Sequence, residues 1–295
     1  MYDFKALYEA NSVQEAIRLL DEHPDAVILA GGSDVLIDTR SGKLAGREMI
    51  SIYGMDELRG VSIDDEDNIR IGSLTSFSAI CRDPIINEHI KVLAEACSMV
   101  GSPQIRAIGT IGGNTCNGVT SADSASTLMA YDAVMETEGP QGTRRIPISE
   151  WYIKPHQVAM AHDELQTAIL IPLKSCSGYT GCYMKYGMRN AMEITTTGCS
   201  VNVKLSEDRK TFEDVRVGFG VAAPVPIRAH TAEQAVRGKE VSEENIRLFA
   251  DQTLEDVRPR DSWRASKDFR LHLCRTLAED ALREAVRRSG GVING

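Results

Sequence analysis

Closely spaced cysteines are missing from this sequence. It has seven cysteines in 295 residues, and no two of them form a Cys-x-x-Cys pair. Iron–sulfur clusters are usually held by such close-spaced runs, so we do not expect this chain to hold one by itself. An odd number of cysteines in a chain that we expect to be cytoplasmic favours reduced thiols over a disulfide framework.

Long apolar runs and an excess of positive charge are also missing. No run approaches the roughly 20 apolar residues that a membrane helix needs. The start, Met-Tyr-Asp-Phe-Lys-Ala, lacks the basic and apolar regions of a signal peptide, so we expect a cytoplasmic protein that does not bind a membrane. The formal net charge of −9 argues against nucleic acid as a partner, because a phosphate-binding surface needs a concentration of Lys and Arg.

The side-chain arrangements of common hydrolases and metalloenzymes are absent as well. The six histidines show no His-x-x-x-His spacing, and no Gly-x-Ser-x-Gly elbow accompanies them. The acidic run 64–68 lacks the glycine and distal glutamate of a calcium loop, so we interpret it as a solvated hairpin turn. We therefore expect no catalytic side chain and no protein-bound metal, and any redox chemistry would belong to a cofactor.

One stretch stands out, from Gly109 to Asp123. Its fifteen positions hold four glycines, three threonines and two asparagines, which is too polar for a core and too dense for a plain turn. We interpret it as a loop whose backbone N–H groups wrap a pyrophosphate and leave Asp123 free for a ribose hydroxyl. An ordinary surface loop is the alternative. Cys116 has no neighbouring His or basic residue to lower its pKa, so we expect it to pack against the cofactor rather than to act as a nucleophile.

A second stretch repeats this chemistry near the N-terminus. An apolar strand runs into Gly31-Gly32-Ser33-Asp34 and out into another apolar segment. Neither stretch contains Gly-x-Gly-x-x-Gly or the Gly-Lys-Ser/Thr ending of a P-loop. We therefore expect two separate glycine-rich turns that hold one cofactor.

These residues carry a resemblance to a known family. Ala30-Gly31-Gly32-Ser33-Asp34, followed by 101–106 and Thr110-Ile111-Gly112-Gly113-Asn114, resembles the FAD-binding (medium) subunit of the molybdenum hydroxylases. The resemblance continues through 185–189, 219–228 and 263–267, so it covers essentially the whole chain. Within the family, the flavin subunit of the bacterial three-subunit xanthine dehydrogenases is the most similar.

The resemblance implies a set of FAD-binding positions. They are Ile28, Leu29, Ala30, Gly31, Gly32, Ser33, Asp34 and Val35 in the first turn, Thr75, then Thr110, Gly113, Asn114, Asn117 and Asp123 in the second stretch, and Leu165, Gln166, Lys185 and Arg189. Gln166 is more polar than expected for a contact with the isoalloxazine ring. A cation such as Lys185 near the N1 to C2 edge of the flavin would raise its reduction potential. Alternatively, Lys185 and Arg189, four residues apart, form only a cationic helix or strand face.

The resemblance also implies partners and a role. A large partner subunit would bind the molybdenum cofactor and hydroxylate xanthine or a related purine. A small partner would carry two [2Fe-2S] clusters and pass electrons to the FAD of this chain, which would pass them to NAD+ or another acceptor. Two alternatives stay open: a stand-alone FAD-dependent oxidase or dehydrogenase, for which no flavin-linking His or Cys is evident, and a nucleotide-binding interaction module without redox activity.

The implied fold is α+β. A two-part FAD-binding region of the vanillyl-alcohol-oxidase/PCMH type, with domains 1–57 and 58–175, would precede a C-terminal antiparallel sheet with helices on one face, 176–295, like the C-terminal domain of CO dehydrogenase flavoproteins. Ser12-Val13-Gln14-Glu15 predicts a capped helix. We expect strands at 26–30, 49–52, 61–63, 69–72, 133–137, 144–148, 165–172, 198–205 and 215–221, and helices at 77–81, 90–100, 243–257 and 267–288.

Overall fold

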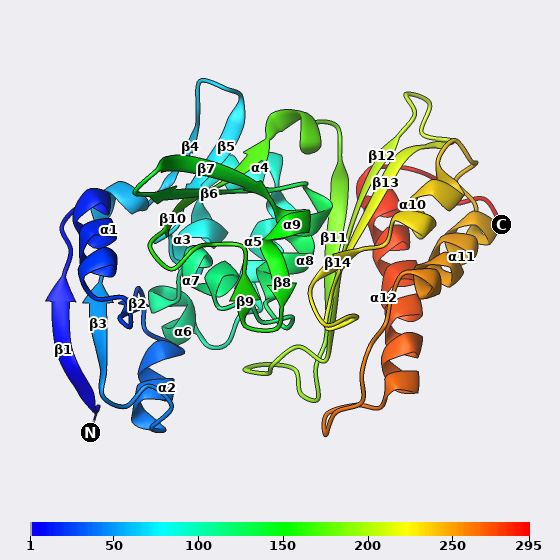
Figure 1. Ribbon diagram of the computed structural model, residues 1–295. Coiled ribbons are helices and arrows are strands. Elements are labelled where there is room, and N and C mark those ends of the chain that lie inside the picture. The colour runs from blue at the N-terminus through cyan, green and yellow to red at the C-terminus, as the bar shows by residue number, and fades with distance from the viewer. Residues whose placement is uncertain (1) are drawn as a thin grey trace.

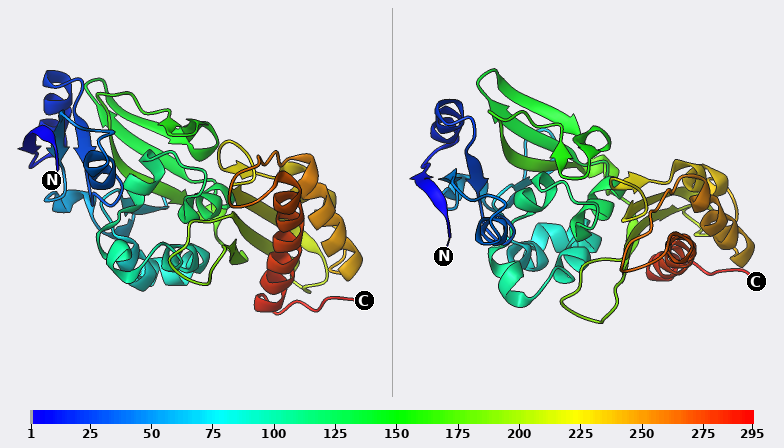
Figure 2. Two further views of the ribbon diagram at one scale, coloured as in Figure 1. Left: turned by 90° about the horizontal axis from the view of Figure 1, so that it is seen from below. Right: turned by 60° about the horizontal axis from the view of Figure 1, so that its bottom comes forward.

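The computed structural model describes residues 2–295 and has three main β-sheets arranged along one direction. The N-terminal sheet lies at one end, the largest sheet in the middle and the C-terminal sheet at the other end (Figures 1 and 2). The architecture is α+β, as predicted. Within residues 2–295, no helix combines the length and the apolarity needed to cross a bilayer.

The N-terminal unit is a small parallel sheet with two helices. Its strands have the order β1 (Phe4–Glu9), β3 (Arg47–Ser51), β2 (Val27–Leu29). Helix α1 (Val13–Glu22) begins at the predicted cap, where the Ser12 hydroxyl accepts from the Glu15 N–H. Helix α2 (Val35–Arg40) follows the first glycine-rich turn. Strand β1 was not predicted.

The middle unit is a five-stranded antiparallel sheet. Its order is β4 (Val61–Ile63), β5 (Asn68–Gly72), β10 (Leu165–Pro172), β6 (Val134–Gly139), β7 (Gly142–Pro147). The helices between β5 and β6 are α3 (Phe77–Arg82), α4 (Pro84–His89), α5 (Lys91–Ser98), α6 (Pro103–Ile108), α7 (Ile111–Cys116) and α8 (Asp123–Ala130). After β7 come α9 (Ile148–Trp151) and a hairpin of β8 (Tyr152–Lys154) with β9 (Gln157–Val158). Strand β10 is buried over nearly its whole length, because it is the central strand.

The C-terminal unit is a four-stranded antiparallel sheet. Its order is β11 (Thr180–Tyr186), β12 (Thr197–Leu205), β13 (Phe212–Gly220), β14 (Ile227–Arg228). Its own helices are α10 (His230–Val236), α11 (Glu243–Gln252) and α12 (Lys267–Arg288). The side chains of Cys199, Val201 and Val203 share one core with residues of α12 such as Ala278. Helix α10 was not predicted.

Helix α8 of the middle unit covers the opposite face of this C-terminal sheet. All eight residues of α8 are buried. A Cβ atom at Gly218 of β13 would lie 2.1 Å from the Ser126 carbonyl oxygen, so glycine is required for this close approach. The Asn202 amide of β12 donates to the Ala130 carbonyl across the same contact. The sheet therefore has helices on both faces, one face being covered by the preceding unit.

The stretch from 109 to 123 is not the polar loop that we predicted. It forms helix α7, a turn over 117–122 and the start of α8, and its Thr115 side chain is fully buried. The Thr115 hydroxyl donates to nearby helix carbonyls and to Gln166, which lets so polar a segment lie in the interior. The predicted domain boundaries at 57/58 and 175/176 fall in connections between sheets. The division into three domains stays a prediction.

Candidate cofactor-binding site

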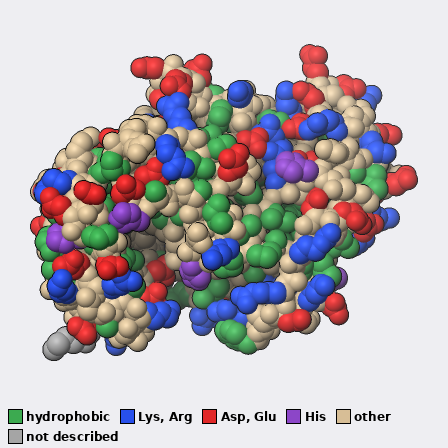
Figure 3. Space-filling model, in the orientation of Figure 1, with side chains coloured by type: hydrophobic (Ala, Val, Ile, Leu, Met, Phe, Trp, Pro, Cys, Tyr) green, Lys and Arg blue, Asp and Glu red, His purple; other side chains and the backbone are tan. Residues whose placement is uncertain are grey.

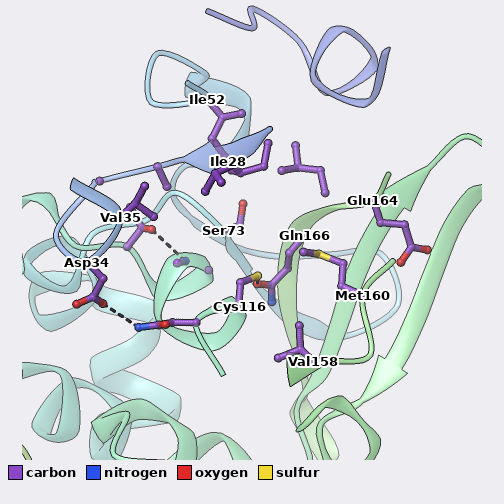
Figure 4. A pocket seen from close by; sticks show the side chains of 18 of the residues that line it. Ile28, Asp34, Val35, Ile52, Ser73, Cys116, Val158, Met160, Glu164 and Gln166 are labelled. Atoms are coloured by element: carbon purple, nitrogen blue, oxygen red, sulfur yellow. Dashed lines mark hydrogen bonds between the residues drawn. The ribbon is translucent and has the colours of Figure 1, made fainter. Parts of the chain in front are cut away.

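A cavity of about 520 Å³ lies between the N-terminal unit and the middle unit. Both glycine-rich stretches line it, and Figure 3 shows the surface hollowed between these two parts of the molecule. Figure 4 shows the side chains around it, with Ile28 and Val35 on one side and Gln166, Val158 and Met160 on the other. The volume is within the range of small-molecule and cofactor sites.

The first turn offers unused backbone donors to this cavity. Within residues 2–295, the N–H groups of Gly31, Gly32, Ser33 and Asp34 have no hydrogen-bond acceptor. Gly32 has a φ of +74°, which glycine adopts without strain. Gly31 is packed against the backbone of α6, where a Cβ would lie 1.8 Å from the Ile108 carbonyl oxygen. The turn is thus held rigidly while its N–H groups stay open to an anion.

Helix α7, in contrast, uses its first N–H groups for packing. The Ile111 N–H donates to Thr75 O at 3.0 Å, and the Gly112 N–H donates to Ser73 O at 2.8 Å. The Gly113 N–H donates to the Thr110 hydroxyl at 3.1 Å, which caps the helix. These bonds fix α7 at the wall of the cavity and leave no free donor among the three groups.

A hydrogen bond between side chains joins the two glycine-rich stretches. The Asn117 amide donates to the Asp34 carboxylate at 2.9 Å, shown as a dashed line in Figure 4. The two residues are 83 positions apart in the chain. The sequence prediction that both stretches meet at one site agrees with this contact.

Gln166 and Cys116 lie side by side at the cavity wall (Figure 4). The Gln166 side-chain oxygen accepts from the Thr115 hydroxyl and from the Cys116 thiol, each at 2.9 Å. The polarity of Gln166, unexpected for a flavin contact, therefore serves to tie β10 to α7. Burial raises the pKa of the Cys116 thiol to about 12, which fits a packing residue and not a nucleophile.

Several lining residues are not among the FAD-binding positions that the resemblance implies. They are Ser73 and Leu74 after β5, and His156, Val158, Met160 and Glu164 from the segment between β8 and β10. No motif marks these residues, because only the fold brings them to the glycine turns. The Glu164 carboxylate is held by the Arg144 guanidinium at 2.9 Å and by the Ala161 N–H at 2.8 Å, which closes this segment over the cavity.

The FAD-binding positions implied by the resemblance are only partly gathered at the cavity. Those that line it are Ile28, Ala30, Gly31, Gly32, Ser33, Asp34, Val35, Thr110, Gly113, Asn117, Leu165 and Gln166. Leu29, Thr75, Asn114, Asp123, Lys185 and Arg189 do not line it. The Thr75 hydroxyl bonds both backbone groups of Gly60, at 2.9 and 3.1 Å, and so fixes the segment before β4.

The expectation that Asp123 has a free carboxylate is wrong for this structure. One oxygen accepts from the hydroxyls of Tyr183, at 2.8 Å, and Thr195, and the other from Lys185 at 2.9 Å. The Lys185 ammonium also donates to the Met99 carbonyl at 3.1 Å. Burial, reinforced by the neighbouring Asp123, raises the pKa of Tyr183 well above its ordinary value, so its hydroxyl stays a donor.

Lys185 and Arg189 do not share a helix or strand face. Lys185 lies in β11, and its ammonium is buried in the ion pair with Asp123. Arg189 lies beyond the end of the strand in an exposed loop, where it pairs with Glu193 at 3.1 Å. Contact of either residue with a flavin stays a prediction.

The cavity suits a dinucleotide held by backbone groups. Among its lining residues there is no Lys or Arg, so an anion there would be bound by the N–H groups of the first turn. The Ser73 hydroxyl is buried at the cavity and has no partner within residues 2–295, which leaves a polar group for a ligand (Figure 4). Ile28 on one side, and Val158 and Met160 on the other, supply apolar surfaces for an aromatic ring. The residues present thus fit FAD.

The chain is similar to known proteins over its whole length. Residues 2–174 match the FAD binding domain in molybdopterin dehydrogenase, and residues 182–285 match the CO dehydrogenase flavoprotein C-terminal domain. The xanthine dehydrogenase FAD-binding subunit of Escherichia coli O157:H7 is 40% identical over 291 residues, which cover 99% of each chain. The carbon monoxide dehydrogenase medium chain of Hydrogenophaga pseudoflava is 27% identical, over 94% of this chain and 95% of that one.

Solved structures agree with this match. A structure of carbon monoxide dehydrogenase from Hydrogenophaga pseudoflava has a TM-score of 0.91 at 27% identity, covering 98% of this chain and 99% of that chain. Quinoline 2-oxidoreductase from Pseudomonas putida 86 has a TM-score of 0.90 at 19% identity, covering 97% and 98%, and so shares the fold.

Proposed function

Since this chain belongs to the FAD-binding (medium) subunits of the molybdenum hydroxylase family, we propose that it carries electrons through one bound FAD between two other proteins. The chain is an oxidoreductase subunit of the xanthine dehydrogenase type. The observation that carries the proposal is the cavity between the two glycine-rich stretches, with its four unused backbone N–H groups. Bound FAD would supply the redox chemistry.

The residues of this chain would bind and orient the cofactor. The N–H groups of Gly31 to Asp34 would hold the pyrophosphate, and the Asp34–Asn117 hydrogen bond would keep the two units at the right separation. The apolar wall of Val158 and Met160 would exclude water from one side. The remaining positions implied by the resemblance, with Lys185 and Asp123 beside the flavin ring, belong to the same proposal.

The partners in this proposal follow from the relatives. A small subunit with two [2Fe-2S] clusters would deliver electrons, and a large subunit with the molybdenum cofactor would hydroxylate xanthine or another purine, in a heterotrimer. NAD+ would be the acceptor. The proposal is supported by the 40% identity to a protein named as a xanthine dehydrogenase subunit.

A binding experiment tests the cofactor assignment. We expect the chain, purified alone and incubated with FAD, to retain about one FAD per chain, read from the flavin absorbance after gel filtration. Asn117→Ala should weaken FAD binding severalfold, because it breaks the link between the two stretches. Asn190→Ala is the control, since this exposed amide makes no hydrogen bond within residues 2–295. A wild-type chain that takes up no FAD would refute the assignment.

The acceptor is tested separately on the FAD-loaded chain. Anaerobic addition of NADH should bleach the flavin absorbance, because hydride transfer is reversible. If NADH leaves the absorbance unchanged while dithionite bleaches it, FAD is bound and NAD+ is not the acceptor. Co-purification from the native host, with iron and molybdenum analysis of the complex, tests the two partners.

A further inference from the structure

The two cations that the resemblance implies near the flavin are both paired with carboxylates. Lys185 pairs with Asp123 at 2.9 Å, and Arg189 pairs with Glu193 at 3.1 Å. The first pair is buried, with 9% of the lysine side chain and 8% of the aspartate side chain exposed. Each pair is neutral as a whole, so neither supplies a net positive charge to its surroundings.

Arg270, near the start of α12, is a buried cation without such a partner. Only 3% of this residue is exposed, and its guanidinium donates to the Thr196 carbonyl and, at 2.8 Å, to the Ser262 hydroxyl. Both acceptors are uncharged. The Nε atom of Arg270 is buried and has no acceptor among residues 2–295. Buried charges in proteins are usually paired, so this guanidinium is an exception.

The groups nearest to Arg270 do not offset its charge. Burial, together with the positive charges of Arg260 and Arg264, lowers the pKa of Arg270 below its ordinary value. An arginine nevertheless stays protonated at neutral pH. Cys274, in the next turn of α12, stays neutral because burial raises its pKa to about 12. The start of α12 therefore holds a buried net positive charge.

Two aspartates near the start of α12 lie apart from this guanidinium. Asp261 and Asp268 are both exposed, and among residues 2–295 neither carboxylate approaches Arg270 within 4.0 Å. The Asp261 carboxylate accepts from the Lys267 N–H at 2.7 Å and so stabilises the turn before the helix. Water screens exposed charges far more strongly than buried ones, so these aspartates offset little of the charge of Arg270.

Hydrogen bonds join Arg270 to the network around Lys185. The Thr196 carbonyl, which Arg270 binds, follows directly after Thr195, whose hydroxyl donates to Asp123. Asp123 in turn accepts from Lys185. In Figure 1 the loop after β11 and the start of α12 lie at the same end of the C-terminal unit. The unpaired charge therefore lies close to the residues that the proposed function puts beside the flavin ring.

We propose that Arg270, and not Lys185, is the cation of this chain that raises the reduction potential of the bound FAD. FAD that takes up two electrons and one proton gains one negative charge, which a nearby positive charge stabilises. The residues that line the cavity include no Lys or Arg, so a cation that acts on the flavin must come from outside this lining. The electron donor is the iron–sulfur subunit of the proposed function, on which this inference rests.

Two substitutions at Ser262 test the charge while they leave Arg270 in place. Ser262→Asp puts a carboxylate against the guanidinium and should neutralise it, whereas Ser262→Asn has nearly the same size and no charge. In the FAD-loaded chain we expect Ser262→Asp to shift the equilibrium at least tenfold toward oxidised FAD, which is about 30 mV for two electrons. Ser262→Asn should keep the wild-type potential. Anaerobic titration with dithionite and a reference dye measures the potential.

Substitution of Arg270 itself gives a second test. Arg270→Gln removes the charge and should lower the potential as Ser262→Asp does, whereas Arg270→Lys keeps the charge and should stay close to the wild-type potential. The control is Arg283→Gln in the same helix, because Arg283 is paired with Glu243 at 2.8 Å and lies about 20 Å further along the helix axis. This control should keep the wild-type potential.

The outcomes separate this inference from the proposed function. A wild-type chain that takes up no FAD contradicts the proposed function. FAD-loaded Ser262→Asp with the wild-type potential, or with the same potential as Ser262→Asn, overturns the inference. So does an equal fall in Arg270→Lys and Arg270→Gln, because the shape of the side chain and not its charge would then control the potential. If Arg270→Gln does not fold, the two Ser262 variants decide, because they retain Arg270.

Discussion

Gly31 to Asp34 and Gly109 to Asn117 are both rich in glycine and small polar residues, and both border the same cavity. In the first stretch four successive backbone N–H groups have no acceptor among residues 2–295. In the second the glycines permit close packing: a Cβ at Gly112 would lie 2.6 Å from the Ser73 carbonyl oxygen. Glycine content alone therefore does not distinguish a turn that binds a ligand from a helix that positions one.

The largest effect is expected at the end of the second stretch. Lys185→Met should lower the free energy of unfolding of the chain by about 3 kcal/mol, because it leaves the buried Asp123 carboxylate without its cation. Urea denaturation of the FAD-free chain measures this. The double variant Lys185→Met/Asp123→Asn should recover part of the loss. A change below about 1 kcal/mol would mean that the pair is not a packing element.

The next effect concerns the packing role of Gly112. Gly112→Ala should lower the free energy of unfolding by about 1–3 kcal/mol, because the new methyl group meets the Ser73 backbone, which cannot move without shifting the turn after β5. The control is Gly54→Ala, where a Cβ meets nothing within 4 Å. Equal stability of the two variants in urea denaturation would contradict the packing interpretation.

A ligand-specific effect is expected at Gly32. Gly32→Ala and Gly42→Ala both place alanine at a positive φ, +74° and +88°, at a backbone cost of about 1–2 kcal/mol. A Cβ at Gly32 also lies 2.9 Å from the end of the Leu36 side chain, which must shift, whereas a Cβ at Gly42 meets nothing within 4 Å. Gly42 lies outside the cavity lining, so only Gly32→Ala should weaken FAD binding, by about tenfold or more. Titration with FAD, followed by flavin fluorescence, compares them. The same loss in both variants would mean that strain, and not the cavity, controls binding.

The last prediction concerns the thiol of the second stretch, whose reactivity should affect neither folding nor FAD binding. With a pKa of about 12, the Cys116 thiol is almost entirely protonated at pH 8. As long as the pH is below this pKa, each increase of one pH unit raises the thiolate fraction about tenfold. Alkylation by iodoacetamide should therefore be about a thousandfold slower than for an ordinary thiol. Mass spectrometry of digested protein measures it, and denatured protein is the control for reagent access. Rapid labelling of the native chain at pH 8 would show that Cys116 is reactive.

Local signals predicted most of the elements. The Ser12 cap and the strands at 61–63, 69–72 and 165–172 are confirmed, because each depends on residues adjacent in the chain. Strand β1 carries charged Lys5 and Glu9 at exposed positions of an edge, which leaves no clear apolar alternation. Its parallel pairing with β3 joins residues about 43 positions apart, which no local pattern reveals.

The sequence predicted those parts of the candidate site that carry a recognisable motif. The two glycine-rich stretches were found, but their different roles depend on partners elsewhere: the Ser73 and Thr75 carbonyls occupy the N–H groups of α7. Asp123 was expected to be free, and the residues that occupy it lie 60 to 72 positions further along the chain. The wall of Val158 and Met160 carries no motif at all.

Helix α8 lies between the core of the middle unit and the C-terminal sheet, with every residue buried. The two matched regions, 2–174 and 182–285, thus meet across a helix that belongs to one and is covered by the other. A gene that encoded only the first region would yield a product with a bare helix face and a tendency to aggregate. We therefore expect the two regions to occur together in the same chain among related proteins.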